Sequence, residues 1–367
     1  WFDHEVDVKK WPGFEVLFFP EAREVSVFPF LDLLAAKDKR AFLEMEKLKQ
    51  AGFEVVGVYM RQWSPDVLGY ECVWKTERQD AMRVAVKLGI PFLTWDFSKE
   101  YEKQVGKYMI DSYKKGITPN PDVMCNKIIK FGLFFDRAMK EGADFVATGH
   151  YAKIKDGKLF CSKDKNKDQT YFLYTIRKEQ LNKIIFPVGG YTKPEVRELA
   201  KKFGLHLAGK KDSQGVCFVG QMEMKRFLKE YIKPKKGNIL AVGGKVLGEH
   251  DGIYYYTIGQ RRGLDIKDGK GPYFVVKKDI KKNIIYVGKK KDLLEKKAMV
   301  KNISWINKPE KFPVNLDAMI RYRSPLAKAM LYENGNLIFK KPQSAVAPGQ
   351  SAVFYKGRQL LGGGVID

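Results

Sequence analysis

Short apolar runs alternate with helical periodicity along the first half of the chain. Residues 53–60 (FEVVGVYM) form a β-branched apolar run that is typical of a buried strand. A helical pattern follows at residues 76–89, where Gly89 and Pro91 end it. The pattern further predicts a strand at 92–97, an amphipathic helix at 99–115, a Pro/Asn loop at 117–126, a helix at 127–141 and a strand at 143–148. This alternation predicts an α/β domain with a parallel sheet covered by helices.

The ends of the predicted strands mark a candidate pocket. Ligands of parallel sheets bind at the carboxyl ends of the strands. Met60 ends the first of these strands, and Gly149 and His150 follow the strand at 143–148. We expect Met60 and Gly149 to border one pocket, with His150 packing near it rather than acting as a catalytic base.

The pattern changes after about residue 220. A short helix at 223–232 precedes β segments separated by Gly-Gly and Asp-Gly turns. Successive strands are then predicted at 298–306, 316–324, 327–333, 336–341 and 351–356, with a hairpin at Asn334-Gly335. A small antiparallel barrel or sandwich is the expected C-terminal fold. The predicted boundaries are 1–220 for the α/β domain, 221–295 for a central domain and 296–367 for the C-terminal domain.

Net charge adds a second observation. The 367 residues include 67 Lys and Arg against 43 Asp and Glu, a net charge of +24. Such an excess favours polyanionic partners, although lysines that only hydrate the surface explain it equally well. No apolar run approaches the roughly 20 residues that span a bilayer, and residues 1–10 lack a secretory-signal layout. We therefore expect a cytoplasmic protein.

Four cysteines, Cys72, Cys125, Cys161 and Cys217, are the candidates for thiol chemistry. None belongs to a C-x-x-C pair, and with four histidines in the chain no metal site is predicted. Cys72 and Cys161 have no role that the sequence supports. Cys125 follows the run TPNPDVM, and Cys217 lies in the Gly-containing segment DSQGVCF.

Two interpretations of Cys125 remain open at this point. Asp122 precedes it by three residues, so one helical turn would place a proton-shuttling carboxylate beside a thiol. A helix N-terminus near Cys125 would also favour the thiolate. Alternatively, Asp122 caps a helix and Cys125 is buried as a small hydrophobic residue. Burial is likewise the alternative for Cys217.

Six segments together resemble the tRNA-specific 2-thiouridylases. They are PNPDVMCNKIIKF (119–131), ADFVATGHYAKI (143–154), KDQTYFLY (167–174), DSQGVCFVG (212–220), YTIGQRRGL (256–264) and the C-terminal APGQSAVFYKG with LLGGGVI. The resemblance runs in order from about Gly52 to Asp367. It implies an ATP-pyrophosphatase (adenine nucleotide alpha-hydrolase-like) catalytic domain, a small central domain and a tRNA-binding C-terminal β-barrel.

The resemblance also implies a role for individual residues. Cys125 and Cys217 would be the catalytic cysteines, with Cys217 carrying a persulfide, and Asp122 would be the general acid or base. Met60 and Gly149 would border the nucleotide. The implied tRNA contacts are Asn120, Pro121 and Asp122 at the target base, Lys167, Asp168 and Gln169, and Arg321 and Tyr322.

The implied reaction is ATP-dependent 2-thiolation of the wobble uridine in Lys, Glu and Gln tRNAs. ATP, with Mg²⁺, would adenylate the base, which must leave the anticodon stack to reach a pocket. The Cys217 persulfide would then deliver sulfur, and Cys125 would release hydrogen sulfide or form a Cys125–Cys217 disulfide. The sulfur donor would be a persulfide relay protein or a cysteine desulfurase.

One region departs from the family pattern. The family has a Ser-Gly-Gly-Val-Asp-Ser pyrophosphate loop, whereas residues 34–40 read LAAKDKR and no Gly-Gly occurs before Gly52. Lys37, Asp38 or Lys39 could approach phosphate, but alanines lack the backbone freedom of glycine. Residues 1–30 match nothing in the family, so an artefactual start or a real loss of ATP binding is expected. The alternatives are therefore a tRNA-binding protein with impaired catalysis, or an ATP-pyrophosphatase that acts on a small molecule.

Overall fold

A computed structural model describes residues 26–31, 52–63, 74–202 and 224–367, with the backbone alone described for 26–31. The chain divides into two compact units. One comprises residues 1–102 and 125–221, and the other comprises residues 103–124 and 222–367. The segment 103–124 therefore packs with the C-terminal half of the chain, which the sequence pattern did not indicate.

A parallel sheet is the centre of the first unit, as the strand–helix alternation predicts. The strand order is β4-β3-β1-β5-β8, with β2 paired to β1, and every pairing is parallel. Because β3 and β4 lie on one side of β1 and β5 and β8 on the other, the order reverses between β1 and β5. The strands are β1 (Ser26–Leu31), β2 (Glu54–Val55), β3 (Gly57–Arg61), β4 (Phe92–Asp96), β5 (Phe145–Thr148) and β8 (Ile184–Ile185).

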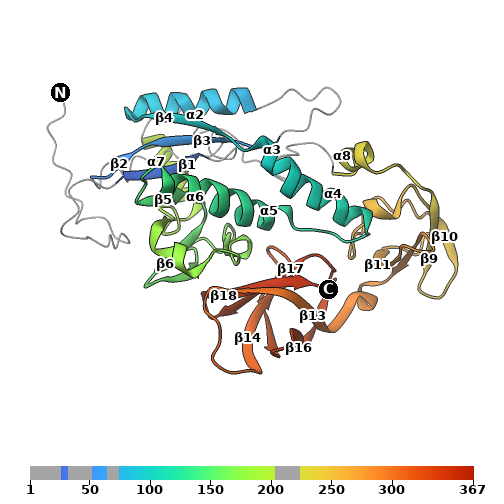
Figure 1. The fold of residues 1–367 in the computed structure, drawn as a ribbon. Coiled ribbons are helices and arrows are strands. Elements are labelled where there is room, and N and C mark those ends of the chain that lie inside the picture. The colour runs from blue at the N-terminus through green and yellow to red at the C-terminus, as the bar shows by residue number, and fades with distance from the viewer. Residues whose placement is uncertain (1–25, 32–51, 64–73, 203–223) are drawn as a thin grey trace. The chain divides into compact units, whose positions relative to one another are not determined.

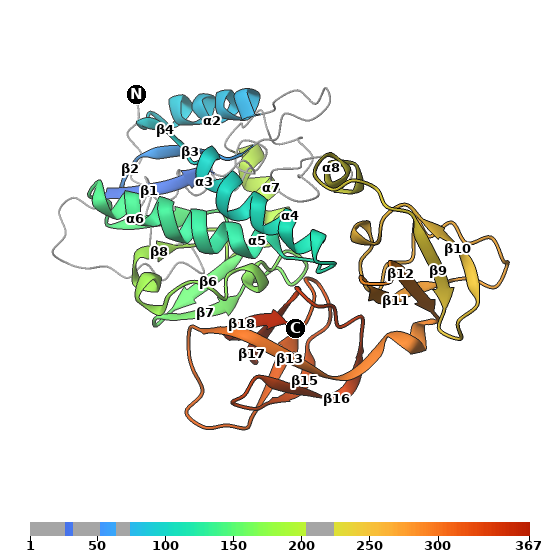
Figure 2. The same cartoon turned by 45° about the vertical axis from the view of Figure 1, so that its right-hand side comes forward.

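Helices cover both faces of this sheet (Figures 1 and 2). On one face, Ala81, Val84 and Leu88 of α2 pack with Tyr59 of β3 and Ala147 of β5 in one buried cluster. On the other face, the Trp95 and Phe134 rings lie 5.0 Å apart. The helices of this unit are α2 (Trp74–Leu88), α3 (Ser98–Tyr101), the π-helical η3 (Cys125–Phe134), α6 (Phe135–Lys140) and α7 (Lys193–Lys202).

The described part of the first unit also contains a hairpin and two short 3-10 helices. Strands β6 (Ala152–Lys155) and β7 (Lys158–Cys161) pair antiparallel, and Asp156 and Gly157 between them have positive φ. The 3-10 helices are η4 (Thr170–Phe172) and η5 (Lys178–Lys183).

The described part of the second unit contains a small mixed sheet and several helical segments, including the 3-10 helices η7 (Ile253–Tyr255) and η8 (Lys290–Leu293). The sheet has the order β10-β9-β12-β11, and Ile239, Val275, Ile285 and Val287 are fully buried in its core. Its strands are β9 (Gly237–Ala241), β10 (Val246–His250), β11 (Phe274–Asp279) and β12 (Ile284–Gly288). The other helical segments are η2 with α4 (Glu102–Gly106, Lys107–Lys114), α5 (Pro121–Met124) and α8 (Met224–Tyr231).

The C-terminal strands close into the predicted antiparallel barrel. The order β13-β16-β15-β14-β17-β18 is closed because β13 also pairs with β18. Closure leaves no unpaired edge, and the interior is apolar, with Leu331, Leu337, Phe339 and Phe354 fully buried. The strands are β13 (Leu294–Trp305), β14 (Val314–Met319), β15 (Ala327–Leu331), β16 (Asn336–Ser344), β17 (Ser351–Lys356) and β18 (Gln359–Ile366).

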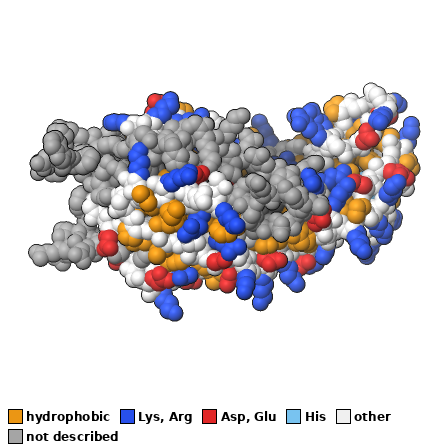
Figure 3. All heavy atoms as spheres, turned by 90° about the horizontal axis from the view of Figure 1, so that it is seen from above, with side chains coloured by type: hydrophobic (Ala, Val, Ile, Leu, Met, Phe, Trp, Pro, Cys, Tyr) orange, Lys and Arg blue, Asp and Glu red, His pale blue; other side chains and the backbone are white. Residues whose placement is uncertain are grey.

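Basic side chains are not confined to one element on the described part of the face that Figure 3 shows. Lysine and arginine side chains lie at many places on it, with acidic side chains between them. None of the described helices is long and apolar enough to cross a bilayer.

Candidate active site

Cys125 lies buried at the carboxyl edge of the parallel sheet. It is the first residue of η3 and is 1% exposed. The Nε2 atom of Gln62, which directly follows β3, lies 4.0 Å from the Cys125 sulfur. Because the chain leaves the sheet at the carboxyl end of β3, this contact places the thiol where parallel sheets bind their ligands. Nothing in the sequence pattern singled out Gln62 except its place after a strand.

The helical segment that contains Cys125 begins six residues earlier than predicted. Asn120 Oδ1 accepts a hydrogen bond from the Val123 amide at 3.3 Å, and Pro121 is the first helical residue. Asparagine at the N-cap and proline at the first helical position are favoured at helix starts. The predicted loop at 117–126 was therefore wrong beyond Asn120. Asp122 lies in the first turn of α5, where an acidic side chain is favoured.

The two residues predicted to border the nucleotide lie on either side of β1. Met60 is buried within β3, and Gly149 directly follows β5. Strand β1 lies between β3 and β5, and in such sheets the crevice for a nucleotide opens at the reversal. The position in the fold suits this role for both residues, and their contact with a nucleotide remains a prediction.

His150 has the packing environment that was expected of it. It is buried, and its ring centroid lies 5.8 Å from that of Phe131 and 5.9 Å from that of Phe186. Its Nδ1 atom lies 2.7 Å from the Thr148 hydroxyl. A histidine between two aromatic rings is well placed to fix the chain after β5.

Asp168 and Gln169, predicted to contact tRNA, make hydrogen bonds within the protein. The Asp168 carboxylate accepts from the Ser162 amide at 2.5 Å and from the Thr170 amide at 3.1 Å. Burial raises the pKa of Asp168 despite these hydrogen bonds. Gln169 Oε1 accepts from the Tyr151 amide at 3.0 Å. Both side chains therefore stabilise the segment that also contains Lys167.

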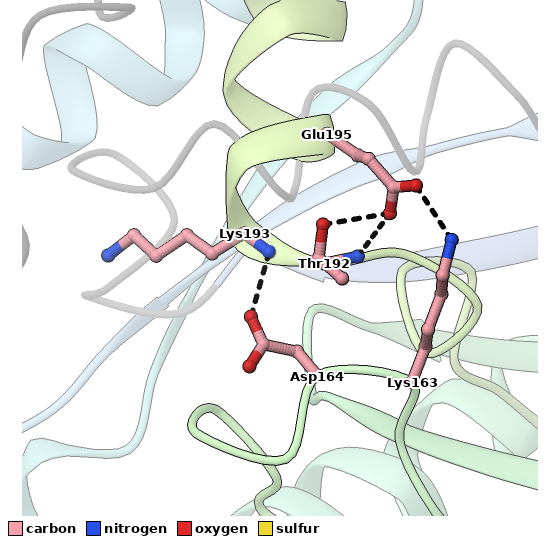
Figure 4. A network of polar contacts seen from close by, with 5 residues as sticks. All are labelled: Lys163, Asp164, Thr192, Lys193 and Glu195. Carbon is pink, nitrogen blue, oxygen red and sulfur yellow. Dashed lines mark hydrogen bonds and ion pairs between the residues drawn. The ribbon is translucent and has the colours of Figure 1, made fainter.

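A polar network connects this segment to the start of α7 (Figure 4). Asp164 accepts from the Lys193 amide at 2.9 Å and from the Lys167 amide at 3.2 Å. Glu195 accepts from the Thr192 amide at 2.6 Å and hydroxyl at 2.9 Å, and from Lys163 Nζ at 2.6 Å. Hydrogen bonds from Lys163 and Thr192 lower the pKa of Glu195 to about 2.

Asn126 joins η3 to the segment after Gln169. Its Nδ2 atom donates to the Phe172 carbonyl at 3.1 Å, and the side chain is 3% exposed. Within the described residues its Oδ1 atom is buried without a hydrogen-bond partner. The sequence motif contains Asn126, but no pattern in it indicated that this residue anchors the helix of Cys125.

Arg321 and Tyr322 lie in a turn after β14 rather than in a strand. The predicted strand at 316–324 ends at Met319, because Arg323 has a φ of +64° and Pro325 follows. Arg321 Nη2 donates to the Ile258 carbonyl at 3.3 Å, and the Arg323 guanidinium lies 5.1 Å from the centroid of the Tyr322 ring. A turn at the barrel end can present these side chains to RNA, which remains a prediction.

Several predicted features lie outside the described residues. They are Cys217 with the DSQGVCF segment, Cys72, and residues 34–40 where the pyrophosphate loop was sought. The described cysteines are Cys125, which is buried, and Cys161, which is partly exposed. Within the described part of the chain, no cluster of three His, Cys, Asp or Glu side chains could bind a metal ion.

Three family models match the chain in succession. The tRNA methyl transferase HUP domain matches residues 42–221, the tRNA methyl transferase PRC-barrel domain matches 225–289, and the aminomethyltransferase beta-barrel domain matches 295–366. Residues 1–41, which include the divergent LAAKDK segment, precede these matches.

Known proteins show the same relationship over most of the chain. The tRNA-specific 2-thiouridylase MnmA of Streptococcus mutans is 45% identical over 337 residues, covering 87% of this chain and 90% of that protein. The namesake of Streptococcus thermophilus has the same identity and coverage. A solved 4-thiouridine synthetase–RNA complex with bound ATP aligns at 17% identity and a TM-score of 0.36, covering 54% of this chain and 46% of that one. That likeness is too distant to bear on function.

Proposed function

Because this chain belongs to the tRNA-specific 2-thiouridylase family, we propose that it transfers sulfur to C2 of the wobble uridine of tRNA in an ATP-dependent reaction. The relatives are named tRNA-specific 2-thiouridylases, and they match nearly nine-tenths of the chain. The proposed acceptors are the Lys, Glu and Gln tRNAs, in the cytoplasm.

One structural observation supports the proposal most directly. The thiol of Cys125 lies at the carboxyl edge of a parallel sheet, beside Gln62 at the end of β3. This edge is the binding face of such sheets, so the proposed catalytic thiol and the proposed nucleotide share one side of the domain.

The proposed chemistry has three steps. The uracil O2 attacks the α-phosphorus of ATP and releases pyrophosphate, which turns a poor leaving group into AMP. The terminal sulfur of a Cys217 persulfide attacks C2 and expels AMP. The Cys125 thiolate then attacks the Cys217 sulfur, which frees 2-thiouridine and leaves a Cys125–Cys217 disulfide for an external thiol to reduce. In the alternative route, Cys125 attacks the persulfide and releases hydrogen sulfide, which attacks C2.

Individual residues of the protein support these steps. Asp122 would exchange a proton with the base or the attacking sulfur, and Asn120 and Pro121 would contact the flipped base. Lys167, Asp168 and Gln169, and Arg321 and Tyr322, would contact the RNA around it. A persulfide relay protein or a cysteine desulfurase would load Cys217.

The strand order offers a position for a nucleotide, but the sequence lacks the glycines of the expected phosphate loop. The strand order reverses between β1 and β5, which Gly149 follows, and Met60 lies on β3 on the other side of β1; a nucleotide crevice opens at such a reversal. The segment after β1 has no glycine from residue 32 to residue 51, so its amides cannot form a glycine-rich phosphate cradle. We propose that ATP, with Mg²⁺, binds at this edge as a substrate with weakened phosphate contacts.

Nucleoside analysis tests the proposed reaction class. Unmodified tRNA would be incubated with the protein, ATP, Mg²⁺, cysteine and a cysteine desulfurase, then digested and analysed by mass spectrometry. We expect 2-thiouridine together with equal amounts of AMP and pyrophosphate, and no product without ATP. AMP release that does not depend on tRNA would instead indicate a small-molecule substrate.

The LAAKDK segment favours one second candidate, a tRNA-binding protein with impaired ATP-dependent catalysis. This function predicts tight binding of labelled tRNA without AMP release at any ATP concentration. Restoring Gly-Gly at residues 35 and 36 (Ala35→Gly with Ala36→Gly) would then raise AMP release. If AMP release by that variant stayed at the parent level, the LAAKDK segment would not be the cause of impaired catalysis.

A further inference from the structure

The loop that precedes α5 is joined to two distant parts of the second unit. The Thr118 amide donates to the Pro348 carbonyl at 3.3 Å. Gln350 Nε2 donates to the Thr118 carbonyl at 2.9 Å and to the Pro119 carbonyl at 3.2 Å. The hydroxyls of Thr118 and Thr257 lie 3.2 Å apart.

Close packing reinforces these hydrogen bonds. Gly349 has a φ of +88°, and a Cβ atom there would lie 2.2 Å from Ile117 Cγ2 and 2.7 Å from the Thr118 carbonyl oxygen. The loop at Gly349 is itself fixed to β18, since its amide donates to the Ile366 carbonyl at 2.8 Å and the Ile366 amide donates to the Gln350 carbonyl at 2.8 Å. Residues 117–119 therefore pack against a barrel loop that is itself held in place by backbone hydrogen bonds.

These contacts fix the point from which the predicted base-contacting residues extend. Both backbone polar groups of Thr118 have barrel partners, although the loop has no regular secondary structure of its own. Asn120 caps α5 two residues later. A displacement of residue 118 would therefore shift Asn120, Pro121 and Asp122 together, and a misplacement of about 1 Å in an active site can cost roughly 100-fold in rate.

We propose that the barrel loop 347–350 and Thr257 position the segment Asn120–Asp122 for reaction with the target base. On this view Thr257 and Gly349 are positioning residues, and the barrel contributes to catalysis in addition to any contact it makes with RNA. The inference rests on the proposed function of residues 120–122, but the positioning itself is measurable without turnover.

Two glycines of the barrel provide a matched comparison. Gly349 and Gly357 both have positive φ, but a Cβ atom at Gly357 would meet no heavy atom of the described residues within 4 Å. Gly349→Ala and Gly357→Ala both place a side chain at a positive φ, and only the first displaces residues 117 and 118. We expect Gly349→Ala to lower kcat at saturating tRNA by at least about tenfold with little change in the Kd for tRNA, and Gly357→Ala to leave both unchanged.

Hydrogen–deuterium exchange of residues 117–124 supplies the readout that does not require catalysis. Exchange should quicken in Gly349→Ala and stay at the parent rate in Gly357→Ala. If the parent makes no 2-thiouridine, the proposed function fails while this exchange difference still tests the positioning. Unchanged exchange in Gly349→Ala, or a weakened Kd with an unchanged kcat, would overturn the inference.

The threonine pair allows a finer test. Thr257→Val removes one hydrogen bond and should lower kcat roughly fivefold, whereas Thr257→Ser keeps the hydroxyl and should restore the parent value. Thr118→Val combined with Thr257→Val should lose no more than Thr257→Val alone, because both remove the same contact. Additive losses in the double variant would contradict a direct coupling.

Discussion

Asp168 shows how a single buried carboxylate can stabilise the segment that is proposed to meet RNA. Its oxygens accept two backbone amides and the Thr170 hydroxyl. Asp168→Asn would turn an NH₂ group toward one of these donors, so we expect the free energy of unfolding to fall by about 1–3 kcal/mol. Urea denaturation of the variant and the parent measures this difference.

The control for Asp168 is Asp136→Asn in the same unit. Asp136 pairs with Arg177 on the surface, with side chains 61% and 60% exposed. Exposed ion pairs contribute little to stability, so Asp136→Asn should change the free energy of unfolding by less than about 0.5 kcal/mol. An equal loss of stability in the two variants would mean that the hydrogen bonds of Asp168 do not stabilise the fold.

Glu195 gives the first unit a pH-dependent contribution to stability. Its pKa falls from an ordinary 4.5 to about 2 through hydrogen bonds from Lys163 and Thr192. Because the folded pKa is the lower one, the stabilisation is complete above pH 4.5 and disappears as the pH falls toward 2. Its size is modest, since Glu195 is exposed.

Glu195→Gln isolates that contribution. We expect the variant to unfold at lower urea than the parent at pH 6, and the difference to shrink steadily between pH 4.5 and pH 2. Glu198→Gln on the same helix removes an ion pair with Lys201 in which both side chains are exposed, and it should leave the stability nearly unchanged. A difference that stays constant with pH would argue against the hydrogen bonds as its source.

At the scale of elements, the start of α5 depends on its cap. Asn120→Ala removes the acceptor for the Val123 amide and should destabilise the helix start by about 1 kcal/mol, whereas Asn120→Asp keeps an acceptor and should not. Hydrogen exchange at Val123 and Met124 measures the change. Equal exchange in the two variants would show that the cap does not stabilise the helix start.

Strands and helices were predictable wherever the periodicity was strong. The apolar run at 53–60 became β2 and β3, and the pattern at 76–89 became α2. The start at Pro121 was missed because an Asn-Pro pair is common both in loops and at helix caps. The turn at Arg321 was missed because its apolar neighbours resemble a strand until the positive φ at Arg323 is known.

The sequence motifs point to candidate site residues, but they do not indicate the contacts that these residues make. A motif indicated Cys125 and merely contained Asn126, whereas burial of the thiol beside Gln62 and the hydrogen bond from Asn126 to Phe172 needed the folded chain. The link from Thr118 to Gln350 joins residues 232 apart. Local pattern cannot show which of many distant segments will meet.

At the scale of the whole molecule, the two compact units do not follow the order of the sequence. Residues 103–124 belong with 222–367, while Cys125 begins the return to the first unit. The segment that is proposed to contact the target base is therefore packed with the C-terminal half of the chain.

The net charge of +24 makes a prediction at the same scale. If lysines and arginines neutralise tRNA phosphates, the association constant should fall by at least about tenfold between 50 and 200 mM salt. Filter binding with unmodified tRNA across that range measures the slope. An affinity that does not change with salt would indicate that the basic side chains only hydrate the surface.

The most direct measurement is the single-turnover yield of 2-thiouridine by three cysteine variants. We predict that Cys125→Ser and Cys217→Ser form no detectable product under conditions in which Cys161→Ser, altered at a thiol outside the proposed chemistry, matches the parent. Product formation at the parent rate by Cys125→Ser or by Cys217→Ser would contradict the account.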